Sequence, residues 1–268
     1  MKALRTAGYY LKSILEMTVN FKNMLCLWPT FLTQRPGKIR MVQLRRPPLR
    51  IKVRGRMDIW SVKETFLDQF YTLYGEAIMD GWTIVDVGAG VGDFSLYAGY
   101  GRPKAVVYAL EPFEESYRLF MENLTLNAVD NVVTFQLALW GQSGDLALDL
   151  SGGEPLQISS QGIGQTPDFT GLDVVQALSL HDFLKSERID RVDLMKMDCE
   201  GAEYEILMQA PREVHEKIDR VIMEYHDLSK VKNHQVLTAF FEELGYHVRC
   251  VENKVHEDIG YLFAARIS

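Results

Sequence analysis

The sequence has few cysteines, no long uninterrupted apolar run, and almost no acidic side chains near its start. Three cysteines in 268 residues exclude a disulfide-stabilised scaffold, and none has the spacing of a zinc motif. The longest uncharged run of the N-terminal region, residues 23–34, contains Pro29 and is too short for the roughly 20 apolar residues of a membrane-spanning helix. Charged residues also interrupt the apolar stretch that a secretory signal needs. We therefore expect a cytoplasmic globular protein.

The few acids at the start reflect an uneven distribution of charge. Residues 1–56 contain 13 Lys/Arg and a single acid, Glu16, which gives a net charge of +12. Residues 57–268 contain 16 Lys/Arg and 35 Asp/Glu, which gives −19. We therefore divide the chain into a basic N-terminal arm, residues 1–56, and a catalytic body, residues 57–268. Such an arm predicts either an anionic partner or docking on the acidic body.

Apolar residues of the arm recur at helical spacing between Leu11 and Trp28, which predicts one amphipathic helix that ends near Pro29. Basic side chains then crowd residues 45–56, which is typical of an extended connector, with a short strand at 49–53. A helix of this kind packs on the body, joins two subunits of a homodimer, or lies on the surface of a membrane. The last alternative would make the protein membrane-peripheral.

Short apolar runs alternate with helical patterns through most of the body, which predicts a parallel sheet with helices on both faces. The strand-like runs are residues 83–87, 105–110, 132–139, 192–197 and 220–224. The helical patterns cover residues 92–100, 114–127, 203–209 and 235–244. Two final strand-like runs, 246–251 and 261–267, follow each other so closely that they must pair antiparallel. We expect an α/β fold with a doubly wound, mostly parallel seven-stranded sheet that ends in an antiparallel hairpin.

Between residues 141 and 180 the alternation stops. Seven glycines separate short strand-like pieces in this segment. A segment of this length without a helical pattern exceeds an ordinary loop. We expect either a β-rich excursion from the sheet or a mobile flap over the site.

The strongest local motif is a glycine-rich loop at the end of the first predicted strand. Residues 85–94 read Val-Asp-Val-Gly-Ala-Gly-Val-Gly-Asp-Phe and open a helix. Glycines let the backbone turn sharply and approach a ligand, and the N-terminus of a helix offers unpaired N–H groups. Asp86 is expected beneath the loop, where it would accept hydrogen bonds from backbone N–H groups. The candidate cofactor-binding residues here are Asp86, Gly88, Ala89, Gly90, Gly92, Asp93 and Phe94.

Two nucleotide-type ligands compete for this loop. A dinucleotide loop carries its third glycine at the position of Asp93, so an NAD-dependent oxidoreductase is disfavoured. The second predicted strand ends in Ala-Leu-Glu-Pro, and its Glu111 is placed to accept hydrogen bonds from both ribose hydroxyls of a nucleoside. Pro112 and Phe113 follow Glu111 and complete this part of the candidate site.

A second charged motif follows the fourth strand of the body, where residues 196–203 read Lys-Met-Asp-Cys-Glu-Gly-Ala-Glu. Alternation places Lys196 and Asp198 on one face of the strand, at the edge of the sheet where ligands collect in open α/β folds. Lys196 is expected to pair with a neighbouring carboxylate. Glu224 and His226 follow the fifth strand, at the same edge.

Together these motifs resemble the FkbM family of methyltransferases over about residues 80–265. The resemblance is carried by the glycine loop, Leu110-Glu111-Pro112, Asn123 and Asn127, Ala138-Leu139, the block at 196–203, and Glu224-x-His226. It implies a class I methyltransferase fold, S-adenosylmethionine as cofactor, methyl transfer to oxygen, and cofactor contacts at Ala138 and Leu139. Two positions depart from the family pattern. Cys199 stands where Val or Ile is usual, and Trp140 stands where a small or polar residue is common, so both could alter the pocket.

Methyl transfer from a sulfonium to a hydroxyl depends on positioning, exclusion of water and removal of the acceptor's proton. The candidate catalytic residues are Asp198, His226, Glu224 and Lys196. Asp198 is also a candidate cofactor-binding residue, since it could instead contact the amino group of the cofactor or an acceptor hydroxyl. His226 suits a general base because the ordinary pKa of an imidazole is about 6.5. Asp198, Glu224 and His226 could instead hold a divalent metal, which is not favoured because Lys196 would neutralise the cluster.

The expected function is therefore S-adenosylmethionine-dependent O-methylation of a sugar, glycolipid or secondary metabolite. The main alternative is an RNA methyltransferase whose basic arm binds phosphates. The −19 body would repel phosphates, and the Asp-Pro-Pro-aromatic type of motif used for base methylation is absent after the fourth strand, so nucleic acid is disfavoured.

Overall fold

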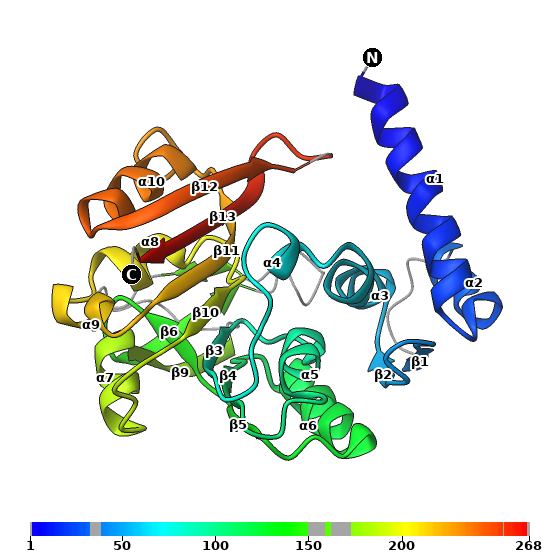
Figure 1. The fold of residues 1–268 in the computed structure, drawn as a ribbon, viewed down its shortest axis with the longest axis horizontal. Helices are drawn as coiled ribbons and strands as arrows, with labels where there is room; N and C mark the ends of the chain where they lie inside the picture. Colours follow the sequence, from blue (N-terminus) through cyan, green and yellow to red (C-terminus); the bar gives the residue numbers. More distant parts are fainter. Residues whose placement is uncertain (1, 33–38, 150–158, 162–172, 254, 267–268) are drawn as a thin grey trace.

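The computed structural model describes residues 2–32, 39–149, 159–161, 173–253 and 255–266. Its central sheet has seven strands in the order β12-β13-β11-β10-β3-β4-β5 (Figure 1). Strand β13 runs antiparallel to both of its neighbours, and the other pairs are parallel. The strands are β3 Thr83–Val87, β4 Val106–Leu110, β5 Val132–Phe135, β10 Leu194–Met197, β11 Arg220–His226, β12 Tyr246–Glu252 and β13 Ile259–Arg266. The predicted fold class, including the terminal hairpin, is confirmed.

Helices cover both faces of this sheet, as the near-continuous apolar strands predict. Successive residues of β3 point to opposite faces: Ile84 belongs to one buried cluster and Val85 to the other. The Ile84 cluster includes helices α5 (Asp93–Gly99) and α6 (Glu114–Asn127). The Val85 cluster includes α7 (Leu180–Ser186), α8 (Glu203–Met208), α9 (Arg212–Glu216) and α10 (His234–Glu243).

The run predicted as one strand at residues 132–139 is two strands that belong to different sheets. Strand β5 ends at Phe135, whereas β6 (Ala138–Trp140) pairs with β9 (Asp173–Ser179) in a second sheet of order β6-β9-β7-β8. The apolar pattern runs through because both strands are partly buried, and Phe135 of β5 and Leu139 of β6 even share one cluster, so hydrophobicity does not mark the break.

The remaining strands of the second sheet fall within the glycine-rich segment. They are β7 (Gly144–Asp149) and β8 (Ser159–Gln161), which pair antiparallel. The described part of the segment is therefore rich in strands. Residues 150–158 and 162–172, where we expected an excursion or a flap, lie outside the described residues.

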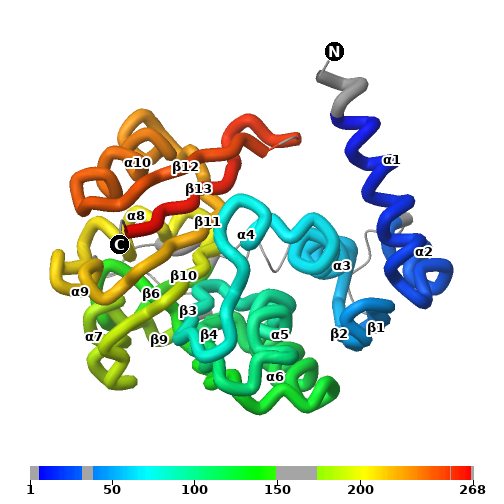
Figure 2. The backbone as a smooth tube through the Cα atoms, viewed as in Figure 1, coloured from blue at the N-terminus to red at the C-terminus, as the bar shows by residue number. Residues whose placement is uncertain are grey.

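The single N-terminal helix predicted to end near Pro29 is two helices. Helix α1 (Lys2–Asn20) ends before Phe21, which forms a β-bridge with Leu44, and α2 (Met24–Leu32) contains Pro29 within it. The break is stabilised by Asn23, whose side chain bonds the backbone of the strand beside it. Within the described residues, neither helix is long and apolar enough to cross a membrane. Figure 2 shows both helices at the opposite end of the molecule from α7 and α9.

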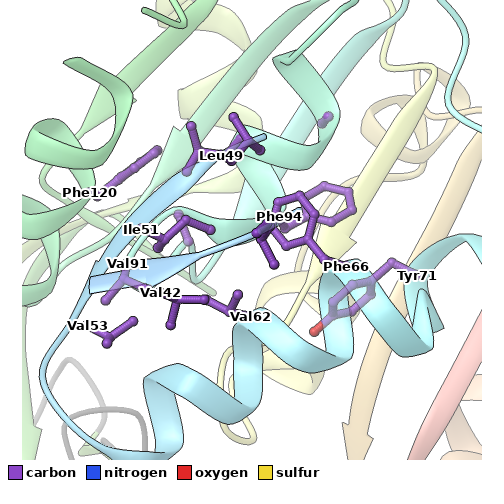
Figure 3. Packing of buried hydrophobic residues seen from close by; sticks show 14 of the residues in the cluster. Val42, Leu49, Ile51, Val53, Val62, Phe66, Tyr71, Val91, Phe94 and Phe120 are labelled. Carbon is purple, nitrogen blue, oxygen red and sulfur yellow. The ribbon is translucent and has the colours of Figure 1, made fainter. Parts of the chain in front are cut away.

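The segment that leads into the body forms a hairpin and three short helices. Strands β1 (Arg40–Gln43) and β2 (Arg50–Val53) pair antiparallel, which confirms the strand expected at 49–53. Helix α3 (Arg56–Lys63), the π-helix η1 (Glu64–Asp68) and α4 (Phe70–Leu73) follow. Figure 3 shows side chains of the hairpin, such as Ile51, packed among Val91, Phe94 and Phe120 of the body. The arm and the body therefore share a hydrophobic core.

Candidate active site

The glycine loop and the charged block meet at the carboxyl ends of β3 and β10, which are parallel neighbours. The chain leaves β3 for β4 on one side and returns to β10 on the other, so this edge is the topological switch point where open α/β sheets bind ligands. A pocket opens here. The predicted site residues that line it are Gly88, Ala89, Gly90, Asp93, Phe94, Glu111, Pro112, Ala138, Leu139, Lys196, Asp198 and Glu224.

Four predicted site residues do not line the pocket. Asp86 is fully buried beneath it, and Gly92 packs against Phe120. Phe113 faces a separate, shallower depression. His226 is buried behind the pocket wall, against two glutamates.

Gly88 is required by a close approach of two backbones. Its φ of +73° lies in the left-handed region, and a Cβ there would come within 2.0 Å of the carbonyl oxygen of Asp198. A Cβ at Gly92, with φ +84°, would lie 2.0 Å from the Phe120 ring. These two glycines therefore bring the ends of β3 and β10, and of β3 and α6, into contact.

Asp86 contacts the loop through Lys196. Contrary to our expectation, it does not accept hydrogen bonds from the loop backbone. Its carboxylate accepts a hydrogen bond from the Ser95 hydroxyl at 2.6 Å and lies 3.1 Å from Nζ of Lys196. Lys196 in turn donates to the Gly88 carbonyl at 2.8 Å. A carboxylate this deeply buried needs a cation, which the neighbouring strand supplies. The expected pairing of Lys196 is thus observed, and it ties the lysine to the loop.

The proton of Lys196 is held firmly. Burial by itself would lower the pKa of Lys196, but Asp86, Asp198 and Asp93 raise the pKa above its usual value. A lysine that stays charged cannot accept the proton of a hydroxyl. The geometry therefore favours a positioning role over the catalytic role predicted for Lys196.

Glu111 bends back to the glycine loop. Its carboxylate accepts hydrogen bonds from the backbone N–H of Gly90 at 2.7 Å and of Phe113 at 2.9 Å. Burial raises the pKa of Glu111 to about 7, against the opposing effect of these two hydrogen bonds. The carboxyl group is thereby fixed in the pocket wall beside the loop.

Three carboxyl groups converge on the inner part of the pocket. Asp198 accepts a hydrogen bond from the Tyr71 hydroxyl at 3.0 Å, and Glu64 accepts one from the Trp60 indole at 2.9 Å. Burial raises the pKa of Glu64 to about 8, and burial together with Asp198 raises the pKa of Glu224 well above its usual value. These shifts favour the protonated forms of Glu64 and Glu224, which can donate hydrogen bonds as well as accept them.

His226 is not free to act as the general base. Its ring nitrogens lie 3.3 Å from Glu203 and 3.4 Å from Glu200. Burial would lower the pKa of His226, but the hydrogen bond and charge of Glu203, together with Glu200 and Asp198, raise it to about 10. A charged imidazole outside the pocket cannot accept a substrate proton. The structure thus argues against the role we predicted from the ordinary pKa of histidine.

The same engagement removes His226 from the candidate metal site. In the described parts of the chain, no three His, Cys, Asp or Glu side chains are grouped so that they could hold a metal ion. Asp198 and Glu224 face the pocket, while His226 faces the glutamates of the 196–203 block. The three residues of the disfavoured metal alternative are therefore not grouped as a ligand set in the structure.

Sequence reasoning missed one wall of the pocket. It is built by residues that precede the first strand of the sheet: Met57, Trp60, Ser61, Glu64 and Tyr71. Ser61 and Thr65 both donate hydrogen bonds to Asp93, which joins this wall to the start of α5. No local motif marks these residues. Their only signal is the four-residue spacing of Trp60 and Glu64, which places two pocket residues on one face of a helix.

Other pocket residues that we did not name as candidate site residues lie on or beside the strands of the second sheet and in the charged block. They are Leu137, Trp140, Leu146, Leu148, Cys199, Glu200 and Ala202. Trp140 and Cys199 are the two departures from the family pattern, and both do lie in the pocket wall. At these two positions, a departure from the family pattern therefore indicated a residue of the pocket wall.

A family model described as the methyltransferase FkbM domain matches residues 86–248. The chain belongs to the FkbM family of methyltransferases. The missed wall at residues 57–71 lies before the matched region, so it is a part of this FkbM-family chain that the family pattern does not cover.

Curated relatives agree with this assignment. The methyltransferase sdnD of Sordaria araneosa is 29% identical over 213 residues, which cover 69% of this chain and 81% of that protein. "Methyltransferase 1" of Beauveria bassiana is 29% identical over 62% of this chain and 72% of its own length. The 31-O-demethyl-FK506 methyltransferase FkbM of Streptomyces tacrolimicus is 26% identical over 62% of this chain and 74% of its own length.

Proposed function

We propose that this FkbM-family protein is an S-adenosylmethionine-dependent O-methyltransferase that acts on a hydroxyl of a sugar, glycolipid or secondary metabolite. One observation carries the proposal: the glycine loop and Glu111 line the same pocket as Asp198 and Glu224. One cavity thus contains both a candidate nucleoside-binding edge and carboxyl groups that can bind a hydroxyl and accept its proton. The name of the Streptomyces tacrolimicus relative, a 31-O-demethyl-FK506 methyltransferase, supports oxygen as the accepting atom.

The residues present fit this cofactor. Glu111 supplies a fixed carboxyl group for ribose hydroxyls, and the apolar side chains of Phe94, Leu110 and Leu139 line the same pocket for an adenine ring. The acidic groups around Asp198 suit a ligand with a positive charge. When bound, S-adenosylmethionine supplies a methyl group that its sulfonium has already activated.

Asp198 is our choice for the group that takes the acceptor's proton. It lies in the pocket with its carboxylate oriented by Tyr71, whereas the raised pKa values of Glu224, Lys196 and His226 favour their protonated forms. Glu224 and Glu64 can orient the acceptor through hydrogen bonds. Exclusion of water from the reacting atoms would favour an in-line transfer.

Calorimetric titration with S-adenosylmethionine tests the cofactor assignment. We expect binding, and we expect Glu111→Gln to weaken it by about 1–3 kcal/mol because one hydrogen-bonding carboxylate is lost. Glu114→Gln is the matched control, since Glu114 is exposed three residues further on and does not line the pocket. Absence of heat with S-adenosylmethionine, or binding of NAD in its place, would refute the proposal.

Labelled methyl transfer tests the reaction. The protein is incubated with labelled S-adenosylmethionine and separate extracts of lipids, glycans, small molecules and RNA, and the labelled product is identified. We expect label in an oxygen-linked methyl group outside the RNA extract. At saturating S-adenosylmethionine, Asp198→Asn should lose about 10²–10⁴-fold in rate. Label found in RNA would favour the alternative function.

A further inference from the structure

The outer face of helix α1 is an apolar stripe exposed to solvent. Leu11, Leu15 and Val19 are 62%, 59% and 66% exposed, and their four-residue spacing puts them on one side of the helix. Ser13 and Met17 lie on the opposite side, and both are buried. The helix therefore has two apolar faces, of which the body covers only one.

The inner face is anchored on the body beside the pocket. The Tyr9 hydroxyl donates to Asp68 at 2.9 Å and accepts a hydrogen bond from Lys63 at 2.9 Å. The Tyr9 ring meets the Trp60 ring edge-on at 6.0 Å, and Trp60 lines the pocket. Because these contacts fix the rotation of α1, the stripe faces away from the body.

Exposed basic side chains follow the stripe along the chain, and one of them contacts its end. Lys22, Arg45 and Arg46 are exposed, and none of them forms an ion pair with a carboxylate in the described part of the chain. Arg45 donates to the carbonyl of Val19 at 2.8 Å, which places its guanidinium at the C-terminal end of the stripe. Leu25 of α2 is 81% exposed and adds apolar surface nearby.

We propose that this stripe, Leu11, Leu15 and Val19 with the cations at its end, docks the protein on an anionic lipid surface. Apolar side chains in a row beside cations match the acyl and headgroup layers of such a surface. A second copy of the chain fits less well, because a symmetric contact would bring together two arms that each carry a net charge of +12.

Docking through this face would place α1 between the membrane and Trp60 of the pocket wall, since the helix contacts Trp60 with its inner face. An acceptor with a lipid anchor could then reach the pocket without leaving the bilayer. This consequence rests on the proposed function, whereas the docking itself does not.

Vesicle sedimentation of the full-length chain tests the docking. We expect binding to vesicles of phosphatidylcholine mixed with phosphatidylglycerol, little binding to phosphatidylcholine alone, and loss of binding as salt rises. Leu15→Glu should weaken binding at least about tenfold, because an apolar side chain that would insert into the lipid becomes a charge that the anionic lipids repel. Lys22→Ala should weaken binding about fivefold.

The matched control is Val231→Glu, which puts the same charge on a side chain that is 74% exposed in a loop outside the arm. It should bind vesicles like the unmodified protein. Unchanged circular dichroism and an unchanged affinity for S-adenosylmethionine would show that Leu15→Glu still folds. Equal binding of the Leu15→Glu and Val231→Glu variants would overturn the proposal. The proposal would also be overturned if the unmodified protein did not bind anionic vesicles and instead formed a dimer that Leu15→Glu dissociates.

Discussion

At the scale of single residues, the glycine loop is shaped by its neighbours as much as by a ligand. Gly88 and Gly101 share nearly the same φ, +73° and +74°, but only Gly88 has another backbone where a Cβ would be. The carbonyl of Asp198 fills that space. Alanine at Gly101 would add backbone strain alone, whereas alanine at Gly88 would add the same strain and a steric clash. Comparing the two variants therefore measures the free-energy cost of the clash.

Gly101→Ala should lower the free energy of unfolding by about 1–2 kcal/mol, the usual cost of a Cβ in the left-handed region. Gly88→Ala should lower it by about 2 kcal/mol more, because the Asp198 carbonyl must move. Urea denaturation of both variants measures the difference. Equal losses would mean that the ends of β3 and β10 can separate freely.

His226 makes a second prediction at this scale. Its pKa of about 10 in the folded protein exceeds the value near 6.5 of an unfolded chain, so the folded state keeps a proton that the unfolded state has lost. This contribution is complete below pH 6.5 and is lost as pH rises toward 10. We expect stability to fall between pH 8 and 10, above the pKa of Glu64, and to fall less in His226→Gln. Thermal unfolding at several pH values measures this. If the unfolding temperature fell equally with pH in the unmodified protein and in His226→Gln, the raised pKa of His226 would be contradicted.

At the scale of elements, two asparagines of α6 hydrogen-bond the backbone of the free edge of β2, as a neighbouring strand would. Asn123 accepts a hydrogen bond from the backbone N–H of Lys52 at 2.7 Å and donates to its carbonyl at 3.1 Å. Asn127 makes the same pair of bonds with Arg50, at 2.9 and 2.7 Å. Asn123 also donates to Val91 of the glycine loop. The motif that suggested the family thus joins the arm to the site.

Asn123→Ala should reduce stability by about 2–4 kcal/mol, because it leaves buried backbone groups without partners. Asn127→Ala removes equivalent bonds at the exposed end of β2, where water can replace them, so a loss of about 1 kcal/mol is expected. Urea denaturation compares the two. A similar loss in both variants would show that burial of Asn123 does not matter.

At the scale of the whole molecule, the boundary expected at residue 57 coincides with a change of charge and crosses the hydrophobic core. Val42, Leu49, Ile51 and Val53 of the hairpin are essentially unexposed and belong to the cluster of the α5 and α6 face (Figure 3). Charge is a property of the surface, so its change along the sequence does not show where a core ends.

A chain that starts at residue 57 should therefore be severely destabilised. Four buried apolar side chains contribute about 6 kcal/mol or more, a large part of the 5–15 kcal/mol that stabilises an ordinary domain. A chain that starts at residue 40 keeps the hairpin and should unfold at a clearly higher temperature. Thermal unfolding with a dye that binds exposed apolar surface measures both. A cooperative transition at the full-length temperature for the shorter chain would contradict this.

The sequence by itself determined the sheet, the terminal hairpin and the edge at which the site lies. These features follow from local properties of the sequence: apolar runs, turn residues, and the positions of Gly88, Glu111 and Asp198 at strand ends. None of them requires knowledge of contacts between residues far apart in the chain. Only the tertiary structure decided three other features. It separated β5 from β6, it placed Trp60 and Glu64 in the pocket, and it put His226 between two glutamates. Each of these depends on residues far apart in the chain, whose packing and charges no local pattern encodes.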